Sequence, residues 1–487
     1  MDWLVNILNF IGNEFLGVPA YLIGIITAIG LMALRRPAGR VIGGGLKATM
    51  GFLILGAGAG VVVGALEPLG ALIFSVTEME GVIPNNEAIS AMATGEFGTS
   101  AAYTLVLGFI VMLLLARFTR MKYIFLTGHH MVFMSLMLVV VLTVGFNGDH
   151  TWLVVLLGAL LLGVIMVVMP ALAQPWMRKI TGDDSVAMGH FSTLGYVAAG
   201  ATGQAVGKKS KSTEDIKFPQ GLAFLRDSMV ATALSMVLIY WVFVIWGVIA
   251  DSETTKAVLG VDGGAGEAIM AGFHQALLFG VGVAIILFGV RTILGELVPA
   301  FQGIGEKVVP GAKPALDCPI VFPYAPNAVL VGFLSSFVGG LAMLGLLAWW
   351  LGPWLGLALI LPGMVPHFFT GATAGVFGNA TGGRLGAMIG GFINGVLITI
   401  LPALLLQVFG NFPDLAGSTY GDTDFGWFGA LIGLSVRAPI VVGVILCLVI
   451  AAVLVVGGLW WQKTRVDTGW VPGGGKLVDG QVVEADD

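Results

Sequence analysis

Apolar runs of about twenty residues recur along nearly the whole chain, and they constrain its fold more than any other feature. A helix of this length matches the thickness of the hydrocarbon core of a bilayer. Of the 487 residues, 57% are hydrophobic and only 10% are charged, whereas soluble domains have roughly 45–50% and 25%. Glycine is also abundant, with 73 residues, and in membranes it permits close helix packing and helix breaks. The sequence therefore predicts an all-α polytopic membrane protein.

The positive-inside rule gives these runs a topology of about eleven transmembrane helices. Arginines follow the first span, whereas the acidic segment around 78–96 contains neither lysine nor arginine. The N-terminus is thus expected outside and the C-terminus in the cytoplasm. Three acidic residues before the last span indicate an outside loop: Asp414, Asp422 and Asp424. The expected spans are about 15–34, 46–75, 101–116, 123–145, 151–172, 227–249, 268–290, 327–350, 353–365, 386–409 and 426–460.

Two further segments are expected to enter the membrane without crossing it. The run 185–205 has basic residues on both sides, which favours a hairpin that enters and leaves on the cytoplasmic side. The Gly-rich stretch 363–383 is a second candidate for a re-entrant loop. Residues 1–465 are therefore expected to form one membrane-embedded domain. The Gly-rich, acidic segment 466–487 is expected to be a disordered cytoplasmic tail.

A weak internal repeat relates the two halves of the chain, at about 15–172 and 227–409. The segments "GALEPLGALI", "VIPNNEA", "LVLGFI" and "LTGHHM" have counterparts "GELVPAFQGI", "VVPGAKPALD", "VLVGFL" and "LPGMVPHF" in the same order. The expected topology gives the two copies opposite directions through the membrane. Inverted repeats with interrupted helices are typical of secondary-type transporters, which bind substrate near the bilayer midplane.

Polar side chains inside apolar runs are candidate binding residues because they are costly in lipid unless paired or facing a wet cavity. The strongest set is His129, His190, Asp317 and Asn327, each beside a Gly or Pro that interrupts a run. Imidazoles and carboxylates together suit a polyhydroxylated, anionic molecule. The alternative is that these side chains only form hydrogen bonds with backbone groups left unpaired where a helix is interrupted, and bind no ligand. Since successive helical residues point 100° apart, His130 is expected to pack rather than face the same cavity.

Other polar residues have a simpler structural interpretation. Glu296 is expected to pair with Arg291 or Lys47, although it and Glu67 could instead carry protons. A lone buried cysteine such as Cys318 is usually a small packed residue. The remaining candidates are His150, His274 with Gln275, and His367, Thr373 and Asn379 in the expected re-entrant loop. The sequence indicates no metal site, no cofactor, no catalytic residues and no nucleic-acid surface.

Several collinear motifs give the chain a family resemblance from about residue 15 to 460. They include "LTGHHM", "MGHFS", "KKSKSTEDIKFP", "GVRTILGELVPAFQGIGEKVVPGAKPALDCP" and "YAPNAVLVGF". Together they resemble the L-ascorbate-specific permeases, the enzyme IIC components of the bacterial phosphotransferase system. The resemblance implies a homodimer in the inner membrane, with a V-shaped scaffold domain and a core domain that moves like an elevator. It also implies that separate IIA and IIB proteins phosphorylate the substrate, through a phosphocysteine of IIB, so this chain itself is not the enzyme.

The same resemblance implies a set of ascorbate contacts. His129, His190 and Asp317 match the family pattern. At the positions of Phe133 and Phe191, the family pattern has glutamine instead. The family has uncharged residues where this chain has Asn86 and Glu87. The implied substrate-binding residues are Asn86, Glu87, His129, His130, Met131, Val132, Phe133, His190, Phe191 and Asp317. L-Ascorbate is the leading substrate, and another sugar or sugar acid is the alternative.

Two functions outside the phosphotransferase system also fit the composition. An ion-gradient-driven transporter would need titrating carboxylates such as Glu67, Glu87 or Glu296, and its uptake would collapse with an uncoupler. A membrane sensor or interaction protein would keep the buried His and Asp residues as structural groups and would accumulate no solute.

Overall fold

The structure is a computed structural model that describes residues 18–78, 81–148, 150–207, 210–216, 228–409, 417–478 and 480–483. Within these ranges nine helices are long and apolar enough to cross a membrane. This confirms a polytopic helical membrane protein. For the first expected span, about 15–34, the described residues contain the helix α2, which is 15 residues long.

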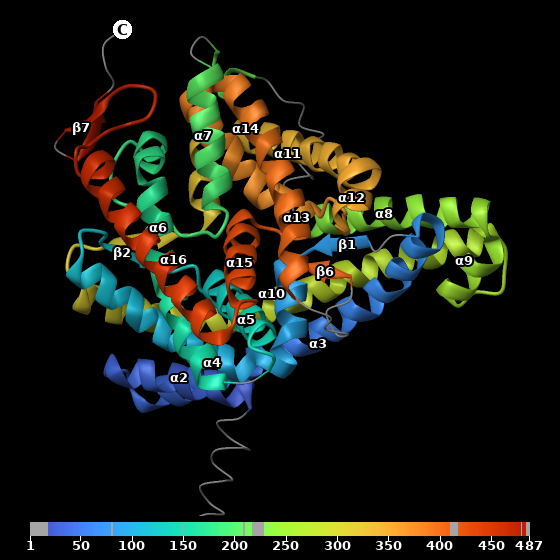
Figure 1. Ribbon diagram of the computed structural model, residues 1–487, viewed down its shortest axis with the longest axis horizontal. Helices are drawn as coiled ribbons and strands as arrows, with labels where there is room; N and C mark the ends of the chain where they lie inside the picture. Colours follow the sequence, from blue (N-terminus) through green and yellow to red (C-terminus); the bar gives the residue numbers. More distant parts are fainter. Residues whose placement is uncertain are drawn as a thin grey trace, which may run out of the picture.

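Helices make up most of the fold (Figure 1). In the first half they are α2 (Pro19–Ala33), α3 (Ala38–Thr77), α4 (Asn86–Phe118), α5 (Gly128–Gly145), α6 (Thr151–Thr181) and α7 (Thr193–Val206). In the second half they are α8 (Ser228–Ala250), α9 (Ser252–Leu259), α10 (Ala265–Val308), α11 (Pro326–Leu346), α12 (Gly352–Leu355), α13 (Met364–Pro366), α14 (Ala372–Phe409), α15 (Thr423–Val436) and α16 (Ile440–Trp461). Shorter 3₁₀ and π turns are η2 (Thr213–Asp215), η4 (Cys318–Tyr324), η5 (Leu347–Leu351), η6 (His367–Gly371) and η8 (Gln462–Val466).

Six short strands lie between the helices and form two parallel three-stranded sheets. They are β1 (Gly81–Pro84), β2 (Tyr123–Phe125), β3 (Ala187–Met188), β4 (Lys313–Leu316), β5 (Leu359–Ile360) and β6 (Ser418–Thr419). One sheet has the order β5-β1-β6 and the other has the order β2-β4-β3. Each strand is followed within a few residues by the start of a helix or of a 3₁₀ turn. The sheets therefore gather several helix N-termini in one region.

The sheet orders repeat the internal symmetry of the sequence. Strand β1 follows α3 in the first half as β4 follows α10 in the second, and β2 follows α4 as β5 follows the α11–α12 segment. Exchanging β1 with β4, β2 with β5 and β3 with β6 converts one sheet order into the other. Each sheet thus takes its middle strand from one half and both outer strands from the other. The two halves are intertwined, and their strand ends share one site.

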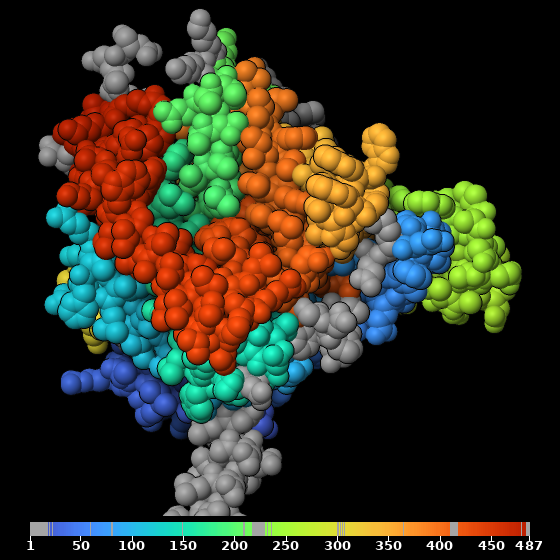
Figure 2. All heavy atoms as spheres, in the orientation of Figure 1, coloured from blue at the N-terminus to red at the C-terminus, as the bar shows by residue number. Residues whose placement is uncertain are grey.

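The long helices α3 and α10 pack along each other and, with α8 and α9, extend to one side of the molecule (Figure 1). Figure 2 shows this group as an arm beside the main body. The largest buried cluster lies in the main body and surrounds α5, with side chains from α4, α6 and α15. Because α5 is enclosed on all sides, the residues at its N-terminus are held in place by packing.

Two of the expected spans are wrong. Residues 353–365 form the short helix α12, strand β5 and the start of α13, because Pro362 and two glycines interrupt any helix there. Gly356 adopts the left-handed conformation with φ of 65°. Residues 426–460 are two helices, and Pro439 at the N-terminal boundary of α16 separates them.

The two segments expected to enter the membrane without crossing it have interrupted backbones. Residues 185–205 contain strand β3 and helix α7. Helix α14 begins inside the expected loop 363–383 and changes direction at the end of that loop, at Gly383, which has φ of 56° and ψ of −145°. The helix turns back there, since a Cβ on Gly378 would meet the backbone oxygen of Gly386 at 2.2 Å.

The tail after residue 465 contains regular structure where the sequence indicated none. Strands β7 (Lys476–Val478) and β8 (Gln481–Val483) form an antiparallel hairpin. The hairpin touches the loop after α6, where the N–H of Val482 donates to the oxygen of Gly182 at 2.8 Å. The side chain of Arg178, which is 1% exposed, also donates to the backbone oxygen of Val466 at 3.0 Å.

Candidate functional site

The ends of the strands bring imidazoles and carboxylates from both halves into one cluster. Helix α5 begins two residues after β2 and carries His129 and His130 in its first turn. His190 follows β3, and Asp317 follows β4. Asp422 follows β6. The sequence separates these residues by almost three hundred positions, and the sheet pairing brings them together.

The outer part of the cluster is the pair of His129 and Asp317. Their Nε2 and Oδ2 atoms are 3.6 Å apart, and the side chains are 25% and 40% exposed. Oδ1 of Asp317 accepts the N–H of Cys318 at 2.7 Å, which fixes the carboxylate at the start of η4. Both residues line a cavity of about 530 Å³. The other lining residues are Leu126, Thr127, Gly128, Leu294, Val298, Leu316, Pro319 and Ile320.

The inner part of the cluster consists of three buried residues, His130, His190 and Asp422. Oδ2 of Asp422 lies 3.7 Å from Nε2 of His130 and 3.9 Å from Nε2 of His190. The two imidazole ring centres are 3.8 Å apart. Nε2 of His190 is also 3.8 Å from Oδ1 of Asp317, so this imidazole joins the inner and outer parts.

Hydrogen bonds fix the orientation of both buried imidazoles. Nδ1 of His130 accepts the backbone N–H of Phe191 at 3.3 Å. In the neutral ring this leaves the proton on Nε2, which faces Asp422. Nδ1 of His190 lies 2.8 Å from the hydroxyl of Tyr196 in α7. As expected, His130 is buried and is not among the residues that line the cavity beside His129, and its Nε2 also faces the carboxylate of Asp422.

Asn86 and Glu87 enter the site from the N-terminus of α4, and both are buried. Oδ1 of Asn86 accepts the N–H of Gly421 at 2.8 Å, and its side chain also bonds the carboxylate of Asp422. Glu87 interacts electrostatically with His129 and Asp317, and its Oε2 has no hydrogen-bond partner among the described residues. The structure thus places both residues beside the His and Asp cluster.

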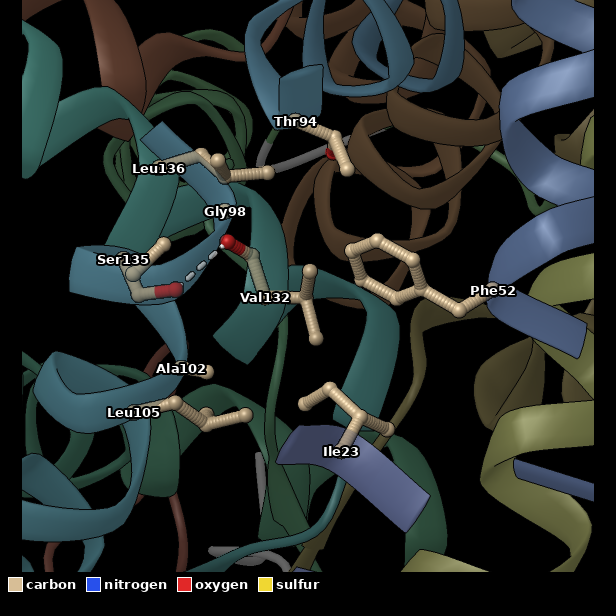
Figure 3. A pocket seen from close by; sticks show the side chains of 10 residues that line it. Ile23, Phe52, Thr94, Gly98, Ala102, Leu105, Val132, Ser135 and Leu136 are labelled. Atoms are coloured by element: carbon tan, nitrogen blue, oxygen red, sulfur yellow. Dashed lines mark hydrogen bonds between the residues drawn. The ribbon is translucent and has the colours of Figure 1, made fainter. Parts of the chain in front are cut away.

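The apolar residues of the expected site divide into two groups. Phe133 and Phe191 are fully buried next to the imidazoles, with Phe133 5.7 Å from the ring of His129 and Phe191 5.9 Å from the ring of His130. Met131 is part of the core around α5. Val132 points away, into a pocket that also receives Ile23 of α2 and Phe52 of α3 (Figure 3). That pocket measures only about 10 Å³, which is about one water.

Asn327, which sequence analysis placed in the strongest set, lies outside the site, as do most of the second-rank candidates. Asn327 holds the η2 segment, since its Nδ2 donates to the backbone oxygen of Ile216 at 2.8 Å. Nδ1 of His367 is paired with Ser336 at 2.8 Å, and Asn379 accepts the N–H of Thr213 at 2.9 Å. Two histidines, His150 and His274, are exposed.

The interpretation of Glu296 as half of a structural pair is confirmed. Its Oε1 lies 3.2 Å from Lys47, and its Oε2 lies 3.1 Å from Arg40, a partner that sequence analysis did not name. Glu67 is exposed.

Sequence analysis placed Asp422 and Asp424 in an outside loop, and this is wrong because both are buried. Asp424 accepts the N–H groups of Thr193 at 2.8 Å and Leu194 at 3.1 Å, so it caps α7. The repeat offered a signal. "GHFS" at 189–192 and "GDTD" at 421–424 both follow a short strand and precede a helix. Asp414 lies outside the described residues.

The inner cluster also has the donor set of a metal site. Nitrogen and oxygen atoms of His130, His190 and Asp422 lie within 4.8 Å of one another, and two overlapping groups include Asp317. Two imidazoles and a carboxylate suit several divalent metals. The sequence-based expectation of no metal remains a prediction.

A second group of charges lies at the start of β4, where Asp184 in the loop after α6 and Lys313 of β4 meet Arg178 in the last turn of α6. Lys313 and Arg178 both bond the carboxylate of Asp184, Arg178 through its Nε at 3.2 Å. Burial by itself would raise the pKa of Asp184, but the hydrogen bond from Lys313 and the two positive charges outweigh burial and lower that pKa. This carboxylate is therefore ionised and fastens β4, the strand that ends at Asp317.

Comparisons with known proteins agree with the geometry. Residues 14–424 match a family model described as the PTS system sugar-specific permease component, where PTS is the phosphotransferase system. The chain is also 29% identical over 376 residues to the ascorbate-specific PTS system EIIC component of Mycoplasma pneumoniae. That alignment covers 69% of this chain and 56% of the relative, so the chain spans little more than half of the relative's length. Because the family model matches most of the chain, this multi-pass membrane protein belongs to the family of PTS sugar-specific permease components, which are transport subunits.

Proposed function

We propose that this protein is the IIC subunit that binds L-ascorbate and carries it inward across the bacterial inner membrane. The observation that supports this best is the cavity of about 530 Å³ in which His129 and Asp317 face each other in front of the buried His190. Its size is in the range of small-molecule sites. The ascorbate-specific relative supports the choice of substrate.

The residues around the cavity suit a hydroxylated anion. Imidazole N–H groups donate to ring and carbonyl oxygens, and the carboxylate of Asp317 accepts from hydroxyl groups. Helices α4, α5 and α7 begin at the cluster, and the positive ends of their dipoles favour a negative charge. Phe133 and Phe191 add apolar surface that suits the face of a sugar ring. The substrate-binding set is thus Asn86, Glu87, His129, His130, Met131, Val132, Phe133, His190, Phe191 and Asp317, with Met131 and Val132 acting through packing.

Translocation follows an elevator-like motion in which a core domain carries this site past a V-shaped scaffold domain, in a homodimer. Basic residues after the first and third expected spans support a topology with the N-terminus outside and the C-terminus in the cytoplasm. A phosphocysteine of a separate IIB partner, itself charged by IIA, then phosphorylates the substrate on the cytoplasmic side. This chain contributes binding and movement.

A carrier driven by an ion gradient is the alternative, and Glu87 is the observation that favours it. Its carboxylate is buried, and within the part of the chain that the structure describes one of its oxygens lacks a hydrogen-bond partner, as expected of a group that takes up protons. The other two carboxylates considered for this role are less suitable. Glu67 is exposed, and Glu296 is held by Arg40 and Lys47.

Uptake of labelled ascorbate into cells tests the proposal. Cells that carry this chain with its IIA and IIB partners should accumulate ascorbate phosphate, and an uncoupler should not abolish this. His190→Ala should reduce uptake by roughly tenfold or more, because a buried hydrogen-bonding group is lost. His274→Ala, which changes an exposed histidine of α10, is the matched control. Uptake of unmodified ascorbate without the partners would contradict the proposal and favour the ion-driven carrier.

A further inference from the structure

Asp422 is a buried carboxylate that faces the site and belongs to none of the residues assigned to the substrate above. Its side chain is 3% exposed, and an ionised carboxylate in such a place requires partners. These partners are His130 at 3.7 Å, His190 at 3.9 Å and the amide of Asn86. The partners come from α5, from the end of β3 and from α4, so Asp422 connects three elements of the first half.

The internal repeat gives Asp422 a defined place. Gly189 and His190 follow β3, as Gly421 and Asp422 follow β6. The helices after them hold each other, because the N–H of Thr423 donates to the hydroxyl of Ser192 at 3.2 Å. Asp422 is thus the counterpart of His190 in the other half, and the two side chains meet at the centre of the site.

The order of the groups from the cavity inward separates the role of Asp422 from that of Asp317. Asp317 is 40% exposed and lines the cavity together with His129. His190 stands between the two carboxylates, with Nε2 3.8 Å from Asp317 and 3.9 Å from Asp422. Asp422 lies behind this imidazole and is not among the residues that line the cavity. A substrate in the cavity therefore meets His129 and Asp317 first, with the buried His190 behind them and Asp422 behind His190.

We propose that Asp422 is a positioning residue of the substrate site, whose carboxylate sets the orientation and the protonated nitrogen of His130 and His190. A carboxylate that faces one ring nitrogen fixes the tautomer and rotamer of an imidazole, as in other sites where the partner of a histidine determines its role. His130 already accepts the N–H of Phe191 on Nδ1, and so presents Nε2–H to Asp422. His190 is held between Tyr196 and the two carboxylates. This inference rests on the proposed function, since it concerns the same site.

The test combines ascorbate binding with a spectroscopic readout on the purified full-length protein. Asp422→Asn keeps the shape and removes the charge, and Asp422→Glu restores the charge on a longer side chain. Asp262→Asn is the control, because it removes an exposed carboxylate in the loop between α9 and α10 instead. With only six histidines in the chain, nitrogen-15 spectra of labelled histidine can resolve His130 and His190 from the exposed His150 and His274.

Asp422→Asn should weaken ascorbate binding by roughly tenfold or more, the size of effect expected when a group that orients ligand-binding histidines is removed. It should also move the ring nitrogen signals of His130 and His190 and leave those of His150 and His274 in place. Asp422→Glu should recover part of the affinity, and Asp262→Asn should change neither readout. Unchanged affinity in Asp422→Asn, or unmoved imidazole signals in both variants, would overturn the proposal. If the wild type fails to bind ascorbate, the proposed substrate is wrong, and the spectra alone then decide whether Asp422 positions the imidazoles.

Discussion

Gly108 in α4 and Gly332 in α11 occupy matching positions of the repeat, in "LVLGFI" and "VLVGFL", but their surroundings differ. A Cβ on Gly108 would meet the side chain of Leu162 at 2.7 Å. A Cβ on Gly332 would meet the backbone oxygen of Gly371 at 2.4 Å and the Cα of Gly375 at 2.5 Å. At this pair of positions, the glycine of the second half therefore packs against backbone, whereas the glycine of the first half packs against a side chain.

The chemistry of the site divides between the halves in a similar way. The imidazoles His129, His130 and His190 all come from the first half, and the carboxylates Asp317 and Asp422 come from the second. A repeated backbone thus supports two different sets of side chains. The two copies therefore share the backbone arrangement of strand ends and helix starts. The pairs of imidazole and carboxylate form because the side chains differ between the copies.

The largest effect is expected from breaking the packing of the second half. Gly332→Ala should lower the free energy of unfolding by about 3 kcal/mol, at the upper end for overpacking, because backbone atoms cannot rotate away. Gly108→Ala should cost less, since the side chain of Leu162 can move. Unfolding in mixed micelles measures both, and Gly345→Ala, with nothing within 4 Å, is the control. Equal losses for Gly108→Ala and Gly332→Ala would show that the halves pack alike.

Much of the fold could be predicted from the sequence. The bilayer sets the length of the apolar helices that span it and the distribution of basic residues between the loops on its two sides. Helices α3, α4, α6, α10 and α14 lie where apolar runs indicated spans. The errors occurred where strands interrupt these runs. A two-residue strand such as β5 has no periodicity of its own, and its existence depends on pairing with β1 from the other half. That pairing is a tertiary interaction that local pattern does not encode.

The candidate site was predicted in part for the same reason. His129, His190 and Asp317 interrupt apolar runs. Because polar side chains are energetically unfavourable in the membrane, the sequence identified them as candidate binding residues. Asp422 lies in a segment rich in Asp and Gly. Such a composition predicts an external loop. Only the pairing of β6 with β1 carries Asp422 into the core. Comparing "GHFS" with "GDTD" as repeat partners would have been the means to find it.

The two sheets provide a second comparison and an intermediate effect. The β2-β4-β3 sheet is fastened by the charged cluster of Asp184, Arg178 and Lys313, whereas in the β5-β1-β6 sheet the hydroxyl of Ser418 bonds the oxygen of Ile83 at 3.1 Å. Asp184→Asn should lower the free energy of unfolding by about 2 kcal/mol, between the values for exposed and buried ion pairs. Ser418→Ala should cost about 1 kcal/mol.

The pH dependence of the Asp184 effect follows from its lowered pKa. Because the folded-state pKa lies below the ordinary value of 3.8, the carboxylate stabilises the fold at every pH above that ordinary value. The stabilisation decreases as the pH falls through the folded-state pKa. The difference between wild type and Asp184→Asn should therefore be constant from about pH 7 to pH 5 and should shrink below about pH 4. A difference that grows on acidification would contradict the assignment of an ionised Asp184.

The smallest effect is expected for the exposed pair that joins the halves, His129 and Asp317. Its atoms are 3.6 Å apart, but the side chains are 25% and 40% exposed, so water screens the attraction. A double-mutant cycle of His129→Ala and Asp317→Ala should give a coupling of about 0.5 kcal/mol in the free energy of unfolding without substrate. The same cycle for the buried pair of His130 and Asp422 should give a larger coupling, because both side chains are only 3% exposed and bulk solvent screens their attraction less. Equal couplings would mean that burial does not distinguish the two pairs, and that the outer pair stabilises the joined halves as much as the inner one.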